Sequence, residues 1–449
     1  MTDSLFSAIS ESAPWWRVRP GTSLTVEGGA RLAGTCRISG AKNAVLPLMV
    51  ATLLSPRPVT LNNVPASLDV AVLAALLRRL GATLNWREDV SGLSLTVTAA
   101  AIHAERIERD LVTRMRASVL LLGALLARSG EADLPLPGGD AIGLRGIDYH
   151  VSGLRAMGAD ITLSDGTVRA RAAAGLKGAD IRLPGPSVGA TENLMLAAVG
   201  ASGITTIRNA AQEPEITDLA HCLTAMGATI SGIGGDTLVI AGGRSLEGAV
   251  HRVMPDRIEF GTLAAAAAIT DGELTLLPGV TGLGDATGLL GAADPVFRQA
   301  GIDLRPVAGG VVARRADAGL AGVDIVTQPF PGFPTDLQAP AMALLAIAEG
   351  AGSITETIFE HRFRHVDELR KMGANITVRG RTALVRGVPR LAGAHVEGSD
   401  VRAAAALLIA GLGAAGRTVL GGLDHLDRGY DRIAEKLAAV GARIHRTEE

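Results

Sequence analysis

One glycine-rich stretch, residues 134–150 with the sequence LPLPGGDAIGLRGIDYH, carries both an acid and a guanidinium. Gly138 and Gly139 can take φ > 0 at little steric cost, so the segment can hinge there. A mobile loop that holds Asp140 and Arg145 is suited to closing charged groups over a bound anion. The alternative is a plain glycine turn whose aspartate hydrogen-bonds its own backbone. Which interpretation holds depends on the rest of the chain.

Other basic residues stand at the starts of apolar helical stretches or on the loops between them. They are Lys42, Arg116 and Arg402 on the helices, and Arg145, Arg362 and Arg428 on the loops. Helix N-termini favour anions, and arginine binds carboxylate and phosphate through two parallel hydrogen bonds. Singly, each arginine could simply form a surface ion pair. Their recurrence at equivalent places predicts a cleft that binds a small substrate with phosphate and carboxylate groups.

Asp336 begins the fifth apolar stretch, directly after Pro334 and Thr335. As a plain helix cap it would need no further role. In a cationic cleft its pKa should fall, which would keep it ionised and able to accept a proton or orient a hydroxyl. Weaker candidates fit caps or ion-pair partners better, namely Glu192, Glu213, Asp256 and Glu259.

The sequence offers no sign of a metal or a nucleotide cofactor. Four histidines are expected in loops and lack metal-ligand spacing, namely His150, His361, His365 and His425. The glycines of residues 279–288 (GVTGLGDATG) imitate a dinucleotide-binding loop, but they lack the βαβ context and the later acidic residue. We therefore expect neither a metal nor a cofactor.

The elements that position these residues form an internal repeat. A helix that ends in apolar-Gly and leads into a strand-like run recurs six times, at intervals of 68 to 77 residues. The glycines are Gly81, Gly158, Gly227, Gly301, Gly373 and Gly441. Glycine just past a helix end is the usual left-handed cap, so each copy predicts a helix-to-strand corner. Each repeat also contains a helix that is apolar nearly all round and should be buried.

A helix of this kind cannot be covered by its own repeat alone, so neighbouring repeats must share it. Three repeats would close into one domain, and six give two domains with a cleft between them. The strand at residues 32–40 is left over and should cross to complete the second domain. We therefore predict one domain from residues 1–41 and 255–449, with Asp336, Arg362, Arg402 and Arg428. The other spans 42–254, with the lid loop, Lys42 and Arg116.

Composition bounds the function. The chain has 449 residues, 47% of them hydrophobic and only 3% aromatic, and its net charge of −2 gives no general attraction for nucleic acid or anionic membrane. Cys36 and Cys222 are far apart, which favours reduced thiols and a cytoplasmic protein. Trp15 and Trp16 are expected to pack an N-terminal extension. A scaffold or clamp built from repeats stays an alternative to an enzyme.

These motifs resemble the enolpyruvyl transferase family, and within it the enzymes that act on UDP-N-acetylglucosamine. The resemblance covers the chain from about Leu24 to the C-terminus, and its motifs include SGAKNAVLP, RMRASV, PGGDAIG, SVGATEN, FPTD and HLDRGY. It implies an α/β fold of two inside-out domains, each with three repeated units around buried helices. It also implies transfer of the enolpyruvyl group of phosphoenolpyruvate to the sugar 3-hydroxyl with release of phosphate, through a tetrahedral intermediate in peptidoglycan precursor synthesis.

The same resemblance assigns roles to individual residues. Lys42, Arg116 and Arg145 would hold the phosphate, while Arg402 and Arg428 would hold the carboxylate. Asp336 would contact the attacking hydroxyl and Asp140 would supply the proton, so Asp140, Asp336 and Lys42 are the expected catalytic groups. Further substrate contacts are implied for Asn43, Asp148, Ser187, Val188, Gly189, Ile358 and Arg362.

The chain departs from the family pattern at the lid and at the nucleotide end. Cysteine is common where this chain has Asp140, and because a carboxylate is not alkylated as a thiolate is, we expect insensitivity to the epoxide fosfomycin. Gly146, Tyr149, Gln212 and Gly185 replace residues that are common near the nucleotide. A paralogue that acts on another nucleotide or sugar therefore stays open as the main alternative.

Overall fold

The computed structural model describes residues 3–16, 22–90, 92–103, 107, 109–279 and 286–448. The chain divides into two compact units. Unit 1 consists of the N-terminal helix, Gly40–Gly139 and Arg145–Met254, and unit 2 consists of the next two strands up to Ser39, Asp140–Leu144 and the chain from Pro255 onward. None of the described helices is both long and apolar enough to cross a membrane.

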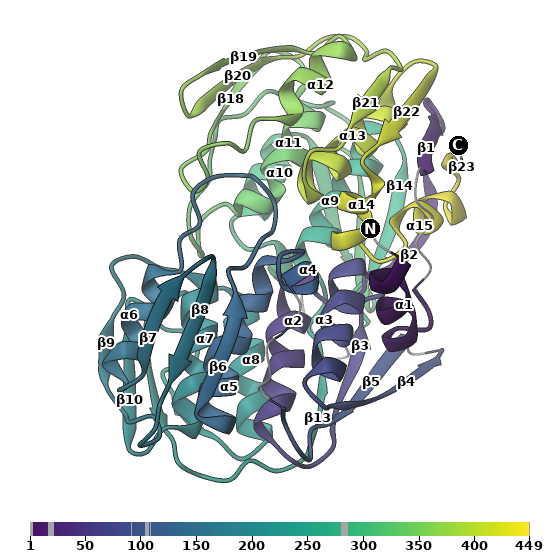
Figure 1. Cartoon of the computed structure of the whole chain (residues 1–449). Coiled ribbons are helices and arrows are strands. Elements are labelled where there is room, and N and C mark those ends of the chain that lie inside the picture. The colour runs from purple at the N-terminus through teal and green to yellow at the C-terminus, as the bar shows by residue number, and fades with distance from the viewer. Residues whose placement is uncertain are drawn as a thin grey trace. The chain divides into compact units, whose positions relative to one another are not determined.

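Unit 1 packs three sheets around three buried helices, α2 (Lys42–Ala51), α5 (Leu121–Ser129) and α7 (Val188–Gly200). The sheets have the strand orders β13-β3-β5-β4, β6-β8-β7 and β11-β12-β10-β9. In Figure 1, β6, β8 and β7 lie side by side, with α5 against β6. The strands are β3 (Val59–Val64), β4 (Thr83–Asp89), β5 (Gly92–Thr98), β6 (Glu131–Pro135), β7 (Asp160–Ser164), β8 (Thr167–Arg171), β9 (Asp180–Arg182), β10 (Ile204–Arg208), β11 (Thr229–Ser231), β12 (Thr237–Ala241) and β13 (Ala249–Arg252).

The remaining helices of unit 1 connect these layers. The outer helices α3, α6 and α8 each run from the loop after a strand to a glycine corner. The connecting and outer helices are α1 (Asp3–Ser12), η1 (Thr52–Leu54), α3 (Leu68–Arg79), α4 (Arg109–Val112), η2 (Arg116–Leu120), α6 (Asp148–Ala156) and α8 (Pro214–Ala225).

Unit 2 repeats the plan around α9 (Arg257–Ile269), α11 (Gln338–Leu345) and α13 (Val401–Gly413), which contact one another pairwise. Every residue of α9 is buried, as expected for a helix that is apolar nearly all round. The sheets have the orders β15-β16-β14-β2, β17-β18-β20-β19 and β21-β22-β1-β23. The strands are β1 (Thr22–Glu27), β2 (Ala33–Arg37), β14 (Glu273–Leu277), β15 (Ile302–Val307), β16 (Gly310–Arg315), β17 (Ile325–Val326), β18 (Ala351–Thr355), β19 (Asn375–Arg379), β20 (Thr382–Arg386), β21 (His395–Glu397), β22 (Arg417–Gly421) and β23 (Arg443–Glu448).

The other helices of unit 2 are shorter. They are η3 (Ala286–Leu290), α10 (Ala293–Gln299), η4 (Thr335–Leu337), α12 (His365–Lys371), α14 (Leu423–Gly429) and α15 (Ile433–Ala439). Figure 1 shows α11 and α13 inside the unit, with β18, β19 and β20 along one side. Residues 280–285 of the glycine-rich stretch lie outside the described residues.

The six predicted corners are confirmed by the backbone. Each of the six glycines has φ between 90° and 103°, in the region that disfavours side chains, and each lies one or two positions before a strand. They are Gly81, Gly158, Gly227, Gly301, Gly373 and Gly441. The repeat therefore has a physical basis, because the same left-handed turn redirects the chain from outer helix to sheet in every copy.

The unit boundaries differ from the predicted ones at two places. β2 pairs with β14, so the leftover strand at residues 32–40 lies in unit 2, and β1 joins it there by pairing with β22 and β23. By contrast α1 packs on α3 in unit 1, where Arg78 donates to the Glu11 carbonyl at 2.7 Å and the Trp86 ring packs edge-on against Trp15 at 5.4 Å. Asp140–Leu144 lies in unit 2, because the Ile142 carbonyl accepts a hydrogen bond from the His361 amide at 2.9 Å.

Candidate active site

Asp336 joins two buried arginines in unit 2. Its Oδ1 accepts from Arg362 Nη2 at 2.7 Å, and its Oδ2 accepts from Arg402 Nε at 3.1 Å and Nη2 at 2.7 Å. Burial alone would raise the pKa of Asp336, but the charges of Arg402 and Arg362 outweigh it and hold that pKa well below the usual range. Pro334 is the N-cap of η4, so Asp336 is not a helix cap. The carboxylate is ionised and fixed in orientation.

Local sequence explains why Arg402 points where it does. Asp400 caps α13 by accepting from the amides of Arg402 at 2.9 Å and Ala403 at 3.0 Å, which fixes the first turn of the helix. The Arg402 guanidinium also lies 5.2 Å from the centre of the Tyr430 ring. Only 3% of Arg402 is exposed, so its charge must be balanced inside the protein, and Asp336 supplies that balance.

The lid acid is bound to a second arginine of unit 2. Arg428, on α14, donates from Nη1 to Asp140 Oδ1 at 2.5 Å, and His425 Nδ1 lies 3.6 Å from the same oxygen. The loop beyond it is held as well, because the Leu144 amide donates to Glu360 Oε2 at 3.2 Å. A Cβ at Gly143 would lie 2.2 Å from that oxygen, so only glycine permits this approach.

The hinge glycines at the other end of the lid lie against residues 113–116 in unit 1. A Cβ at Gly138 would lie 1.7 Å from the Thr113 carbonyl oxygen, and Gly139 has φ of 113° and sits against Arg116. Close packing therefore requires glycine at 138, whose φ is not positive, contrary to expectation, and the left-handed backbone favours glycine at 139. The close packing of these glycines is not visible in the sequence, because residues 113–116 are distant along the chain.

Arg116 begins η2, and its Nη2 donates to the Gly146 carbonyl in the loop that carries Arg145. Burial lowers the pKa of Arg116 to about 10, helped by the neighbouring charge of Arg145 and opposed by Asp148. The guanidinium still carries its charge at neutral pH. Asp148, the first residue of α6, and Arg145 are both close enough to Arg116 to affect its charge, so these three residues lie near one another in unit 1.

Lys42 is the first residue of α2, followed by Asn43. Its Nζ lies 3.0 Å from Oδ2 of Asp69, which is buried in the first turn of α3. Behind it lies Glu192, whose pKa is raised well above its usual range by burial and by Glu215 and Glu213, and lowered somewhat by Lys42. A lysine in this setting is held in one direction by its partner.

Ser187 is the N-cap of α7, and its Oγ accepts from the Ala190 amide at 3.4 Å, so Val188 and Gly189 form the helix start. His150 packs beside Gly189, and its Nδ1 lies 2.9 Å from Asn193 Nδ2. Burial lowers the pKa of His150 to about 3, with a smaller contribution from Arg116, so the ring is neutral.

Three histidines that were predicted in loops lie in helices. His150 lies in α6 and His365 begins α12, and both are buried, while the half-buried His425 lies in α14. The glycine-rich loop was expected to reach residue 150, but helix α6 already begins at Asp148. Burial of Ile147 and Val151 holds this first turn of the helix in place. Among the described residues no group of histidine, cysteine, aspartate and glutamate side chains is placed to hold a metal ion.

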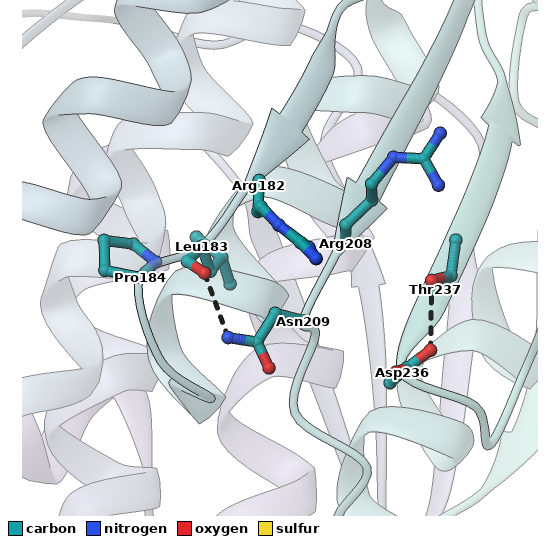
Figure 2. A pocket seen from close by; sticks show the side chains of 7 residues that line it. All are labelled: Arg182, Leu183, Pro184, Arg208, Asn209, Asp236 and Thr237. Atoms are coloured by element: carbon teal, nitrogen blue, oxygen red, sulfur yellow. Dashed lines mark hydrogen bonds between the residues drawn. The ribbon is translucent and has the colours of Figure 1, made fainter.

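A cavity of about 440 Å³ opens beside the ends of β9 and β10 in unit 1 (Figure 2). It is lined by Arg182, Leu183, Pro184, Arg208, Asn209, Asp236 and Thr237, a set that does not overlap with the expected site residues. Arg208 is engaged by two hydrogen bonds to Asp180, and Asp236 accepts from the Thr237 hydroxyl. We assign no chemistry to the cavity.

The structure thus brings some of the predicted residues into direct contact. In unit 2 these are Asp336 with Arg362 and Arg402, and Asp140 with Arg428; Ile358 lies on the loop that leads to Arg362. In unit 1 Arg116 reaches the loop of Arg145. That all of these residues serve one substrate stays a prediction.

Sequence reasoning missed several partners of these residues, namely Asp69, Thr335, Glu356, Glu360 and His425. Asp69 carried a usable signal, since it is the first acid of the outer helix that follows Lys42. Glu360 and His425 carried none, because their role depends on where the lid docks.

The charged helix starts and the repeated sheets define an α/β protein of two inside-out units, each with three repeats around buried helices. Residues 26–437 match the family described as EPSP synthase (3-phosphoshikimate 1-carboxyvinyltransferase). The UDP-N-acetylglucosamine 1-carboxyvinyltransferase of Rhodospirillum centenum is 53% identical over 433 residues, which cover 95% of this chain and 99% of that protein. The protein of the same name from Granulibacter bethesdensis is 51% identical, covering 94% of this chain and 99% of its own length.

Solved structures agree with this assignment. The enolpyruvyl transferase NikO from Streptomyces tendae is 30% identical with a TM-score of 0.86, covering 96% of this chain and 100% of its own. The EPSP synthase of Acinetobacter baumannii, at 20% identity and a TM-score of 0.70 over 95% and 100% of the two chains, shares the fold. The chain therefore belongs to the enolpyruvyl transferase family, and among its relatives are carboxyvinyltransferases named for UDP-N-acetylglucosamine.

Proposed function

We propose that this protein transfers the enolpyruvyl group of phosphoenolpyruvate to the 3-hydroxyl of UDP-N-acetylglucosamine and releases phosphate, in peptidoglycan precursor synthesis. Relatives that are half identical over nearly the whole chain carry the name of this reaction. The observation that supports it best is Asp336, an ionised carboxylate held by two buried guanidiniums. Such a group can accept a hydrogen bond from a hydroxyl in one fixed direction.

The donor is a small anion, and the basic residues suit its two ends. Lys42, Arg116 and Arg145 would bind the phosphate, where positive charge also stabilises the departing phosphate ion. Arg402 and Arg428 would bind the carboxylate, for which the planar guanidinium is the better match. The division follows the family resemblance.

The reaction needs an acid and a group that directs the hydroxyl. The double bond of the donor takes a proton at C3 while the hydroxyl oxygen bonds to C2 and loses its own proton. Loss of phosphate and of a proton from C3 then restores the double bond. Asp140 would give the first proton. Asp336 would orient the hydroxyl and, although its low pKa makes it a weak base, would accept the hydroxyl proton as the bond to C2 forms and the oxygen becomes strongly acidic. Asp140, left ionised by the first transfer, would take the proton back from C3 when phosphate leaves.

Asp140 must become protonated before it can act as the acid. Its carboxylate is paired with Arg428, which favours the ionised form. When the substrate carboxylate takes over Arg428, that stabilisation is lost and the closed, dry lid would raise the pKa of Asp140. Donor binding would thereby prepare the acid.

The acceptor would be held at helix starts and loops. Asn43, Ser187, Val188 and Gly189 lie at the starts of α2 and α7, where the helix dipole favours phosphate oxygens. Asp148 and Ile358 complete the implied contacts. We place the reaction in the cytoplasm, where two free and buried cysteines remain reduced.

The test is phosphate release from phosphoenolpyruvate by the purified full-length protein, with UDP-N-acetylglucosamine, UMP or shikimate 3-phosphate as the acceptor. Of the three acceptors, we expect only UDP-N-acetylglucosamine to support phosphate release. Mass spectrometry should detect one enolpyruvyl product for each phosphate released. Release with another acceptor only would assign the protein to a paralogous activity. No release with any of the three would contradict the proposal.

A further inference from the structure

Glu356 is a buried acid that the proposed reaction does not use. It directly follows β18, and only 1% of it is exposed. Its Oε1 accepts from the amides of Ile358 at 2.8 Å and Phe359 at 3.1 Å, and its Oε2 accepts from the hydroxyl of Thr335 at 2.7 Å. Both oxygens therefore act as acceptors. A buried carboxyl group with this arrangement directs the groups that donate to it.

Thr335 connects Glu356 to the Asp336 cluster. Because its hydroxyl proton goes to Glu356, its oxygen is free to accept from Arg362 Nη1 at 2.9 Å. The other terminal nitrogen of Arg362 donates to Asp336 Oδ1 at 2.7 Å. A continuous hydrogen-bond path thus runs from Glu356 through Thr335 and Arg362 to Asp336. Thr335 is the one member whose hydroxyl can turn, and Glu356 fixes its direction by accepting its proton.

Acids and arginines face each other along this path. Glu356 lies at one end and Asp336 at the other, and Arg362 lies between them. Removal of Glu356 would leave a buried excess of positive charge at Arg362, and would also free the Thr335 hydroxyl to turn. His365, near Arg362, cannot offset this excess positive charge by losing a proton, because burial lowers its pKa to about 4 and the ring is already neutral at pH 7.

We propose that Glu356 is a positioning residue, which acts through Thr335 and Arg362 to fix the direction of the Asp336 carboxylate toward the acceptor hydroxyl. The proposal rests on the function proposed above, because it needs Asp336 to orient that hydroxyl. It adds the residues that decide the orientation. The rival interpretation is that Glu356 only anchors the backbone turn at residues 356–359.

Hydrogen-bond polarity separates the two interpretations. Glutamine at position 356 offers one acceptor oxygen, so it can satisfy either the two backbone amides or the Thr335 hydroxyl, and must place a donor on the other side. Thr335→Val keeps the shape of the side chain and leaves the turn anchored, but it breaks the path. Thr335→Ser keeps the hydroxyl. A pure anchoring role predicts full activity for both Thr335 variants.

The experiment compares Glu356→Gln, Thr335→Val, Thr335→Ser and the Glu356→Gln/Thr335→Val double variant with the wild type. Steady-state transfer from phosphoenolpyruvate to UDP-N-acetylglucosamine is measured, with circular dichroism to confirm the fold. We expect kcat to fall on the order of 10- to 100-fold in Glu356→Gln and in Thr335→Val, since a small misplacement of a reacting group has effects of this size. The KM for phosphoenolpyruvate should not rise.

Two further outcomes decide the matter. Thr335→Ser should retain nearly wild-type kcat, and the double variant should be no slower than the slower single variant, because both changes break the same path. Wild-type kcat in Thr335→Val, or losses that multiply in the double variant, would overturn the inference while leaving the proposed function intact. A wild-type protein that transfers nothing to UDP-N-acetylglucosamine would overturn the proposed function and this inference with it.

Discussion

The basic residues of the two units are balanced in different ways. In unit 1, Lys42 is paired with Asp69, a buried acid of α3, and Arg116 donates to a backbone carbonyl. In unit 2, Arg362 and Arg402 are both bound to Asp336. Arg428, also in unit 2, is bound to Asp140. The partners in unit 1 are structural, whereas those in unit 2 are the two acids assigned to the chemistry.

This difference suggests a division of work. A cation with a structural partner stays in place and can bind a ligand that brings its own negative charge, such as a phosphate. An arginine bound to a catalytic acid controls the direction and the protonation of that acid. We therefore expect changes of the basic residues in unit 1 to act mainly on donor binding, and changes of the acids Asp336 and Asp140 in unit 2 to act mainly on the rate of the chemical steps.

The largest effect is expected for Arg402→Met in unit 2. The change leaves Asp336 with one arginine and removes a group assigned to the donor carboxylate, so transfer should fall by about a thousandfold or more, in the range seen for lost acid–base and electrostatic groups. Stability should also fall by about 3–5 kcal/mol, because a buried pair is broken. Phosphate release and urea unfolding would measure both. Arg379→Met, on the exposed face of β19, is the control and should leave transfer unchanged.

The next effect is expected at the lid. Asp140→Ala should lower kcat by about 10²–10⁴-fold, because the acid is lost. Asp140→Cys should recover much of the activity, since a thiol can also deliver a proton. Unchanged turnover in Asp140→Ala would show that Asp140 is not the acid. Arg428 would then be paired with a structural group, as Lys42 and Arg116 are in unit 1.

The wild type and the Asp140→Cys variant also test the response to fosfomycin. The wild type should keep its activity in the presence of this epoxide, and the Asp140→Cys variant should lose activity with time and gain the mass of one inhibitor molecule. Intact-protein mass spectrometry is the measurement. An adduct on the lid of the wild type would contradict the expectation.

A smaller effect is expected for Lys42→Met in unit 1. The KM for phosphoenolpyruvate should rise by about 10- to 100-fold, the loss that follows removal of a hydrogen bond to a charged group. The dissociation constant for UDP-N-acetylglucosamine should change little, which calorimetry can show. An equal loss of affinity for both substrates would contradict the assignment of Lys42 to the donor.

The smallest effect concerns stability and pH. The pKa of His150 is lowered to about 3 in the folded protein, against about 6.5 when unfolded. Between these values the unfolded chain binds more protons, so the free energy of unfolding should fall as the pH drops below about 6.5, by up to about 1.4 kcal/mol per pH unit for this group. Urea unfolding of His150→Gln should show a shallower slope. His395→Gln, at an exposed position, should not.

Much of the fold follows from local patterns. Gly81 and the five equivalent glycines predicted the corners because a left-handed turn is a local property of the backbone. Apolar helices such as α9 predicted their own burial for the same reason. The unit boundaries were harder, because the place of α1 depends on contacts of Glu11 and Trp15 with distant parts of the chain.

The candidate site divides in the same way. Asp336 and Arg402 could be predicted because both stand at helix starts, which are visible in the sequence. Their direct ion pair could not, since the two residues are 66 positions apart and nothing local links them. The contribution of Glu356 was equally hidden, because its partner Thr335 lies on another element.

The central claim is that the acids held by the arginines of unit 2 serve the chemical steps. Asp336→Asn tests it most directly, through the dissociation constants of both substrates and the single-turnover rate of transfer. The account predicts that both substrates bind within about tenfold of the wild type while the single-turnover rate falls by more than about a hundredfold. A rate that is restored in full when the substrates are raised to saturation would contradict it.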